Sequence, residues 1–231
     1  MLFDLRGRGR RRTVQVIYLS LAVLMGGGLV LFGIGGNTSG GLFDAINGNG
    51  GSGGGSSVDK VAQQRIDTYV RRTRANPSDE ASWLGMAKVR FQVANTGDNY
   101  NATQQAYTAK GLQQLRQADA AWTRYLALNP KKPDAGTANL MVQAYGAAGL
   151  KQYTKAVSAL EIVMDNRAAS AGLYAQLAVL ASGANQTRKS DLSEKKAIAL
   201  APKAQRKQLK SEIDLAKSQV NVQQPGASTS G

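Results

Sequence analysis

The 231-residue chain contains no cysteine and no histidine. It therefore has no thiol for a disulfide, a thiolate metal site or a nucleophile, and no imidazole for a catalytic triad or a metal. Acidic residues are also few, because 15 Asp and Glu stand against 29 Lys and Arg, which gives a net charge of +14. The closely spaced carboxylates Glu161 and Asp165 have a spacing that is common on exposed helices. We therefore expect no catalytic residue, no metal site and no cofactor, and we interpret the chain as a non-enzymatic protein.

An uncharged apolar segment covers residues 13–34 and follows a basic stretch, residues 1–12. A helix of about 22 residues is about 33 Å long, which is enough to cross a hydrocarbon core of about 30 Å. The apolar run is longer than that of a cleaved signal peptide, and no small-residue cleavage site follows it. We therefore predict a single transmembrane helix over residues 13–34. The basic residues that flank it are Arg6, Arg8, Arg10, Arg11 and Arg12.

The distribution of basic residues predicts the orientation of this helix. Five Arg precede it, and the next basic residue is Lys60. Because the more basic flank of a transmembrane helix normally faces the cytoplasm, we place the amino terminus there and the remainder of the chain outside, as a single-pass protein of the cell membrane. Ala22 and Gly26 lie four residues apart, which is compatible with weak homodimerisation through the anchor. We favour the general abundance of small residues in such helices as the explanation of this pair.

Two further segments have the composition of unfolded chain. Residues 35–57 are rich in glycine, serine and asparagine, which is typical of a flexible linker. Residues 221–231 are rich in proline, glycine, serine and glutamine, and we expect a disordered tail there. The folded domain is therefore expected over residues 58–220.

Helical periodicity runs through residues 58–220, and it is interrupted at regular breaks. The breaks fall at Asn76-Pro77, Asn129-Pro130, Asp165-Asn166 and Ala201-Pro202. Proline cannot continue the helical hydrogen bonds, so three of these breaks mark helix ends. Three of the stretches end alike, in TRANP, LALNP and IALAP, which indicates an internal repeat.

Three consecutive segments resemble the tetratricopeptide repeat (TPR), a 34-residue helix–turn–helix unit. The residues that carry the resemblance are Trp83, Met86, Ala87, Ala118, Trp122 and Pro130 in the first unit, Met141, Tyr145, Ala156, Leu160 and Val163 in the second, and Tyr174, Leu177, Ala178, Ala197 and Pro202 in the third. The first unit has an enlarged turn from Asn95 to Thr103. Arg90 stands where an aromatic residue is usual, and Ser190 where alanine is usual. The resemblance implies an all-α, TPR-like α-solenoid of helical hairpins; a generic helical bundle is the alternative.

The last expected helix carries one apolar stripe on an otherwise charged surface. The stripe consists of Leu209, Ile213, Ala216 and Val220, which recur at helical spacing. A terminal repeat must cover its neighbour's core with one face and meet water with the other. We therefore predict a C-terminal capping helix.

The resemblance also implies a groove, because the first helices of TPR units line a surface that binds an extended peptide or a partner helix. The corresponding positions are Lys88, Phe91, Gln92, Asn139, Gln143, Ala175 and Val179. An amide such as that of Asn139 can both donate to and accept from a peptide backbone, and Phe91 is expected to supply an apolar anchor. For each residue taken alone, solvent exposure or packing between helices is the alternative interpretation.

The overall layout is similar to that of the anchored ancillary subunit of the bacterial Sec translocon and periplasmic chaperone network. Its amino terminus also looks like that of actinobacterial TPR membrane proteins, on the segment RGRGRRRTVQVIYL and the later GGGLVLFGIGG. The layout implies an extracytoplasmic scaffold for protein–protein interaction that assists translocation or chaperone complexes.

The alternative hypothesis starts from charge, because residues 59–231 carry 24 Lys and Arg against 13 Asp and Glu. On this hypothesis a basic face binds anionic lipid or wall polymer and organises the envelope. Nucleic acid is disfavoured as a partner, because the predicted topology removes the domain from it and no binding motif is present.

Overall fold

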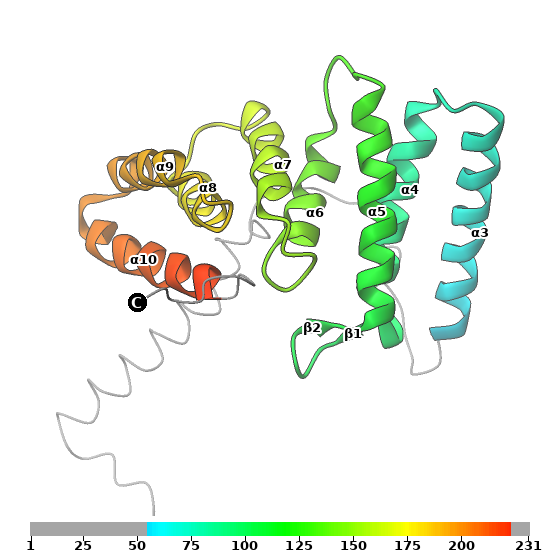
Figure 1. Ribbon diagram of the computed structural model, residues 1–231, viewed down its shortest axis with the longest axis horizontal. Coiled ribbons are helices and arrows are strands. Elements are labelled where there is room, and N and C mark those ends of the chain that lie inside the picture. The colour runs from blue at the N-terminus through cyan, green and yellow to red at the C-terminus, as the bar shows by residue number, and fades with distance from the viewer. Residues whose placement is uncertain (1–54, 223–231) are drawn as a thin grey trace, which may run out of the picture. The chain divides into compact units, whose positions relative to one another are not determined.

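A computed structural model gives the structure of this chain, and it describes residues 55–222 (Figure 1). Within this range the chain forms eight α-helices and one short β-ladder, so the described fold is all-α. The helices, labelled as in Figure 1, are α3 (Gly55–Ala75), α4 (Glu80–Ala94), α5 (Ala109–Ala127), α6 (Ala135–Tyr145), α7 (Tyr153–Asp165), α8 (Ala171–Gly183), α9 (Thr187–Leu200) and α10 (Arg206–Val222). The expected basic tail, transmembrane helix and most of the linker lie outside the described residues, as does the tail from residue 223.

The helical region extends beyond both expected boundaries. Residues 55–57, which were expected to belong to the linker, form the first turn of α3. Residues 221–222, which were expected to begin the disordered tail, form the end of α10. None of the helices between residues 55 and 222 combines the length and the apolar character needed to cross a membrane.

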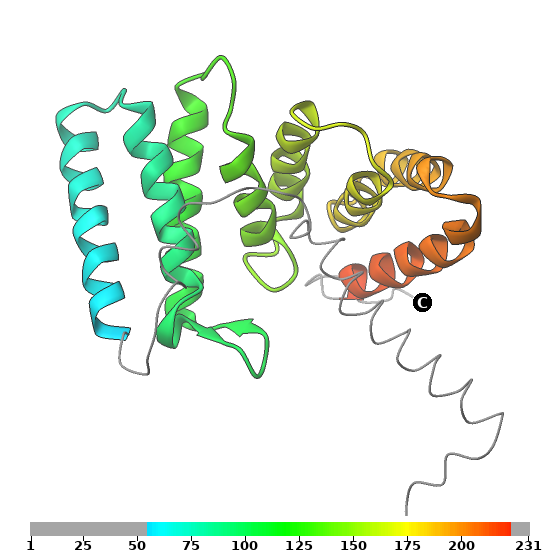
Figure 2. The ribbon, with the colours of Figure 1, turned by 180° about the vertical axis from the view of Figure 1, so that it is seen from behind.

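Neighbouring helices pair as hairpins, and the hairpins follow one another along the chain (Figures 1 and 2). The three hairpins are α4–α5, α6–α7 and α8–α9, while α3 packs on α4 at one end and α10 packs on α8 and α9 at the other. This is an α-solenoid-like architecture. The predicted breaks are confirmed, because α3 ends just before Asn76, α7 ends at Asp165, and α9 ends just before Ala201.

Small and large apolar side chains alternate in the core that joins the hairpins. Ala87, Ala118 and Ala138 are fully buried, so the helix backbones approach closely at these positions. Trp122 is also buried, and its ring stacks on that of Tyr125 with the centroids 5.2 Å apart. Trp122 is thus a core residue.

The two polar departures from the repeat pattern both have partners. The guanidinium of Arg90 donates to Gln114 Oε1 over 2.9 Å and thereby links α4 to α5. Partial burial lowers the pKa of this guanidinium below its ordinary value. Ser190 is buried, and its hydroxyl donates to the carbonyl of Ala178 over 2.8 Å, which links α9 to α8. Hydrogen bonds replace apolar packing at these two positions.

The enlarged turn of the first hairpin is longer than expected and contains a β-ladder. Between Asn95 and Thr108 the chain forms a 3-10 turn, η1 (Gly97–Asn99), and two antiparallel strands, β1 (Tyr100–Asn101) and β2 (Ala106–Tyr107). The rings of Tyr100 and Tyr107 meet edge to face at 5.1 Å. The Tyr107 hydroxyl donates to Asn95 Oδ1 over 2.8 Å, which fixes the ladder to the end of α4.

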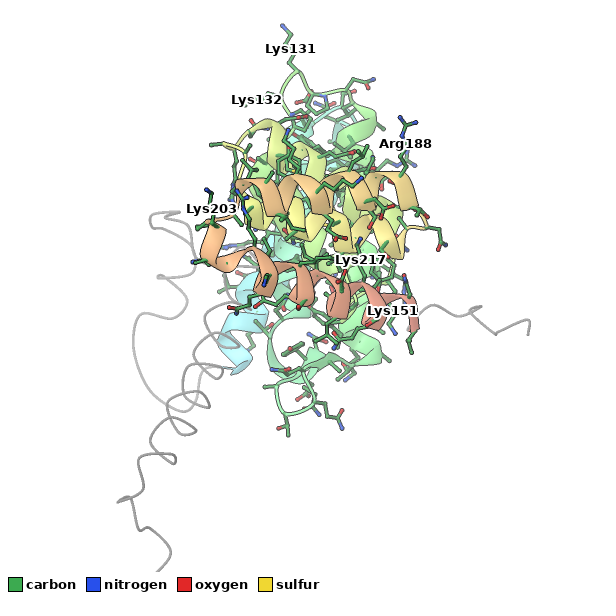
Figure 3. The ribbon with its side chains drawn as sticks, turned by 90° about the vertical axis from the view of Figure 1, so that its left-hand side faces the viewer. Lys131, Lys132, Lys151, Arg188, Lys203 and Lys217 are labelled. Carbon is green, nitrogen blue, oxygen red and sulfur yellow. The ribbon has the colours of Figure 1, made fainter. Side chains whose placement is uncertain are left out.

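The apolar stripe of α10 faces the bundle, as predicted. Ile213 and Val220 are buried, and Leu209 and Ala216 are partly buried. A short 3-10 turn, η2 (Lys203–Gln205), precedes the helix. Figure 3 shows Lys217 between α9 and α10, where its ammonium donates to Glu194 Oε2 over 2.6 Å.

Candidate functional site

The seven expected groove residues lie on α4, α6 and α8, and two of them are buried. Phe91 has 4% of its surface exposed and Ala175 has none, so neither side chain is available to a ligand in this structure. The prediction that Phe91 offers an apolar anchor is therefore wrong. Phe91 follows Ala87 by one helical turn and shares its face, and that face of α4 packs into the core. The remaining five residues are partly exposed.

Three of the five partly exposed residues carry side-chain amides. Gln92 lies on α4, and Asn139 and Gln143 lie one turn apart on α6, so these two share a helix face. Within the described part of the chain, none of the three amides makes a hydrogen bond. Each therefore retains both donors and an acceptor for a ligand.

Lys88, the fourth partly exposed residue, already has a partner. Its ammonium lies 3.3 Å from Asp134 Oδ1, at the start of α6. The same carboxylate accepts from the backbone N–H of Thr137 over 2.7 Å and from its hydroxyl over 2.6 Å, and so caps the helix. Burial raises the pKa of Asp134, but the hydrogen bonds from Thr137 and the charge of Lys88 outweigh burial and bring the pKa below 3.8. Lys88 thus joins α4 to the beginning of α6.

Two cavities lie in the described region, among others, and neither of these two includes an expected groove residue. The first has a volume of about 590 Å³ and lies between Tyr174 of α8 and the first three turns of α9. The second has a volume of about 310 Å³ and lies between the end of α7 and the start of α8. Tyr174 lines both cavities, so they adjoin at this residue. In the sequence, Tyr174 is recognisable only as part of the repeat pattern.

The first cavity is lined by cations around an apolar centre. Its charged lining residues are Arg188, Lys189 and Lys196, and no carboxylate lines it. Lys196 Nζ lies 4.7 Å from the centroid of the Tyr174 ring, a distance typical of a cation–π contact. Leu192 lies on the same wall and has 58% of its surface exposed. The cavity thus suits a ligand with negative charge and an apolar group.

The second cavity has mixed charge. Glu161 and Asp165 of α7 line it together with Arg167. Glu161 is held from the neighbouring hairpin, because Lys189 Nζ donates to its Oε1 over 2.6 Å. Glu161 therefore serves as a link between α7 and α9. Among residues 55–222, no three acidic side chains lie close enough together to hold a metal ion.

Several of the basic residues on which the alternative hypothesis depends are exposed in the structure. Arg71, Arg72 and Arg74 lie exposed near the end of α3. Figure 3 shows Lys131 and Lys132 projecting from the connection between α5 and α6. These positive charges are spread over several surfaces of the described domain.

Comparison of the chain with protein-family models, with curated proteins and with solved structures finds no match in any of the three.

Proposed function

We propose that this chain is a membrane-anchored, TPR-like scaffold that binds other proteins on the extracytoplasmic face of a bacterial cell membrane. The hairpins in series support this proposal, because stacked helix pairs present extended surfaces to partners. The repeat-like pattern of Trp83, Ala118 and the later units supports the assignment to the TPR type. On this proposal the apolar segment 13–34 anchors the domain, and residues 35–54 connect the two.

The observation that carries the proposal is the set of unpaired amides on α4 and α6. An extended peptide exposes backbone N–H and C=O groups that need partners once water is removed. Gln92, Asn139 and Gln143 offer both kinds of partner. Val179, partly exposed on α8, provides apolar contact at the corresponding position of the third hairpin.

Tethering supplies the mechanism in this proposal. A domain held beside the membrane meets membrane-bound or newly exported partners at a high effective concentration. A glycine-rich linker of about 20 residues has a root-mean-square reach of about 25 Å. A low affinity of the groove for its partner is then sufficient for function, because the anchor already holds the domain close to that partner. The process that such a scaffold serves is protein translocation or the work of envelope chaperones.

The test is capture of partners from the native membrane by crosslinking to the full-length protein, followed by mass spectrometry. The variant to compare is the triple substitution Gln92→Ala, Asn139→Ala and Gln143→Ala. A matched control replaces Gln113 and Gln219, two exposed amides on α5 and α10, by alanine. We expect the triple variant to lose the partners that wild type and control retain. An unchanged set of partners in the triple variant would contradict the groove assignment.

A second candidate function rests on the exposed cations. A structural protein that binds anionic lipid or wall polymer through Arg71, Arg72 and Arg74 would lose its ligand at high salt, because exposed charges are screened. It would keep that ligand in the amide triple variant. Binding to anionic vesicles measured at low and high salt, with and without the triple substitution, separates the two functions.

A further inference from the structure

Two cations of the first cavity have no carboxylate partner within the described residues. Lys189 is paired with Glu161, and Lys210 and Lys217 are paired with Glu194. Arg188 and Lys196 form no such ion pair in residues 55–222. Figure 3 shows Arg188 projecting from the first turn of α9 away from the bundle. Two positive charges beside the cavity are thus available to a ligand.

These two cations and Leu192 lie on one side of α9 at regular spacing. Arg188, Leu192 and Lys196 follow one another every four residues, and all three line the cavity. A rise of 1.5 Å per residue separates successive members by about 6 Å and the outer two by about 12 Å. Lys196 is held in place over the ring of Tyr174, and Leu192 presents its exposed side chain between the charges.

We propose that this cavity binds an extended peptide segment of a partner protein with the pattern acidic–x–apolar–x–acidic. In an extended chain, residues 1, 3 and 5 point to the same side and lie about 3.3 Å per residue apart along the chain. The two acidic side chains are then about 13 Å apart, and the apolar one lies halfway. This spacing matches that of Arg188, Leu192 and Lys196. The apolar side chain enters the cavity against Leu192 and Tyr174, while the carboxylates pair with the two cations.

Charge alone does not account for the arrangement. A phosphate-rich polymer supplies anions at short intervals but no apolar group between them, so it leaves Leu192 in contact with water. The peptide covers Leu192 as well as both charges, and apolar burial adds to the binding energy. This site uses none of the amides of the proposed groove, so its failure would leave the groove proposal intact, and the reverse also holds.

The test is fluorescence anisotropy of a labelled peptide, Ser-Asp-Ser-Leu-Ser-Asp-Ser, with the full-length protein in a neutral detergent. A register control, Ser-Asp-Asp-Ser-Ser-Leu-Ser, has the same composition and the wrong spacing. We expect the first peptide to bind at least about fivefold more tightly than the second. Exposed ion pairs contribute modestly, so Arg188→Gln and Lys196→Gln should each weaken binding about threefold. Leu192→Ser should weaken it about tenfold, because it removes the apolar contact.

Two further variants keep the test specific. Lys195→Gln neutralises an exposed lysine of the same helix that does not line the cavity, and it should leave binding unchanged. Lys196→Arg retains the charge over Tyr174 and should preserve binding within about twofold. Equal binding of the two peptides, or equal weakening by Lys195→Gln and Lys196→Gln, would overturn the proposal. Displacement of the peptide by polyphosphate of equal total charge, with no effect of Leu192→Ser, would also overturn it and would identify a surface that selects charge alone.

Discussion

Val220 of α10 packs so closely against Gly183 of α8 that no side chain fits at position 183. A Cβ placed there would collide with Val220 Cγ1 and lie 2.8 Å from Cγ of Tyr153. The last residue of α8 is therefore the point where α7, α8 and α10 meet. Glycine is required at this position by the close approach of the neighbouring helices, and the contact fixes the terminal helix on the bundle.

The first prediction concerns this contact. Gly183→Ala should destabilise the protein by about 1–3 kcal/mol, because the added methyl group overpacks a closed junction. Gly172→Ala in the same helix is the control, since nothing lies within 4 Å of its added Cβ. The control should be neutral or stabilising, by up to about 1 kcal/mol. Urea unfolding followed by circular dichroism measures both. Equal midpoints for the two variants would show that α10 is not docked as described.

A second prediction concerns a hydrogen-bonded link between hairpins. The Tyr145 hydroxyl donates to Asp119 Oδ1 over 2.7 Å, and the ammonium of Lys155 lies 2.8 Å from both carboxylate oxygens. Tyr145→Phe removes a hydrogen bond to a charged acceptor and should cost about 1.5–3 kcal/mol. Thr123→Ala is the control, because its hydroxyl reaches the same carboxylate only at 3.4 Å on an exposed surface. The control should change stability by less than about 0.5 kcal/mol in the same urea experiment.

Alkaline pH provides a third prediction from the same tyrosine. Burial, together with the hydrogen bond to Asp119 and its charge, raises the pKa of Tyr145 far above its ordinary value of 10.0. The folded state therefore holds this proton more tightly than the unfolded state does. Its contribution to stability is fully present below pH 10 and is lost as the pH rises above 10. The urea concentration at the unfolding midpoint of the wild type should decrease as the pH is raised from 9 to about 11. Tyr145→Phe should make this decrease smaller. An identical pH dependence in the variant would contradict the assignment.

The helix boundaries were predictable because local chemistry determines them. Three helix ends are followed by a proline, namely Pro77, Pro130 and Pro202. Proline has no backbone N–H and therefore cannot continue the helical hydrogen bonds. The face of α10 was predictable for a similar reason, because the spacing of Ile213 and Val220 specifies one apolar side. Both features depend on residues within one or two turns of each other.

The features that the sequence did not reveal depend on how separate helices meet. Strands of two residues, such as Tyr100–Asn101, are too short to show an alternating pattern. The position of Phe91 in the repeat predicted that its side chain faces the groove. In the structure, the face of α4 that carries Phe91 packs against neighbouring helices and is part of the core. The cavity beside Tyr174 is formed by side chains of two helices, and its lining could not be read from either one. The charge of Lys196 was visible in the sequence, whereas its position over an aromatic ring was not.

A last prediction concerns the ionic contact that holds α10 on α9 and its loss in acid. Glu194 accepts from Lys217 over 2.6 Å and from Lys210 over 3.3 Å, and only 15% of its side chain is exposed. The hydrogen bond from Lys217 lowers the pKa of Glu194 below its ordinary value of 4.5. The contribution of this contact is therefore present above pH 4.5 and is lost as the pH falls further, because the unfolded state then takes up the proton first.

Glu194→Gln should therefore destabilise the protein at pH 7 by about 1.5–3 kcal/mol, since it removes a charged acceptor and leaves Lys217 half-enclosed. It should also reduce the decrease in the free energy of unfolding that the wild type shows between pH 5 and about pH 3. Glu212→Gln is the control, because within the described part of the chain Glu212 accepts only from the exposed side chain of Gln208 on the same helix. Its effect should stay within about 0.5 kcal/mol. Were Glu194→Gln to behave like this control at both pH values, the attachment of α10 would depend on the Gly183 junction and the apolar stripe, and the ion pair would contribute little.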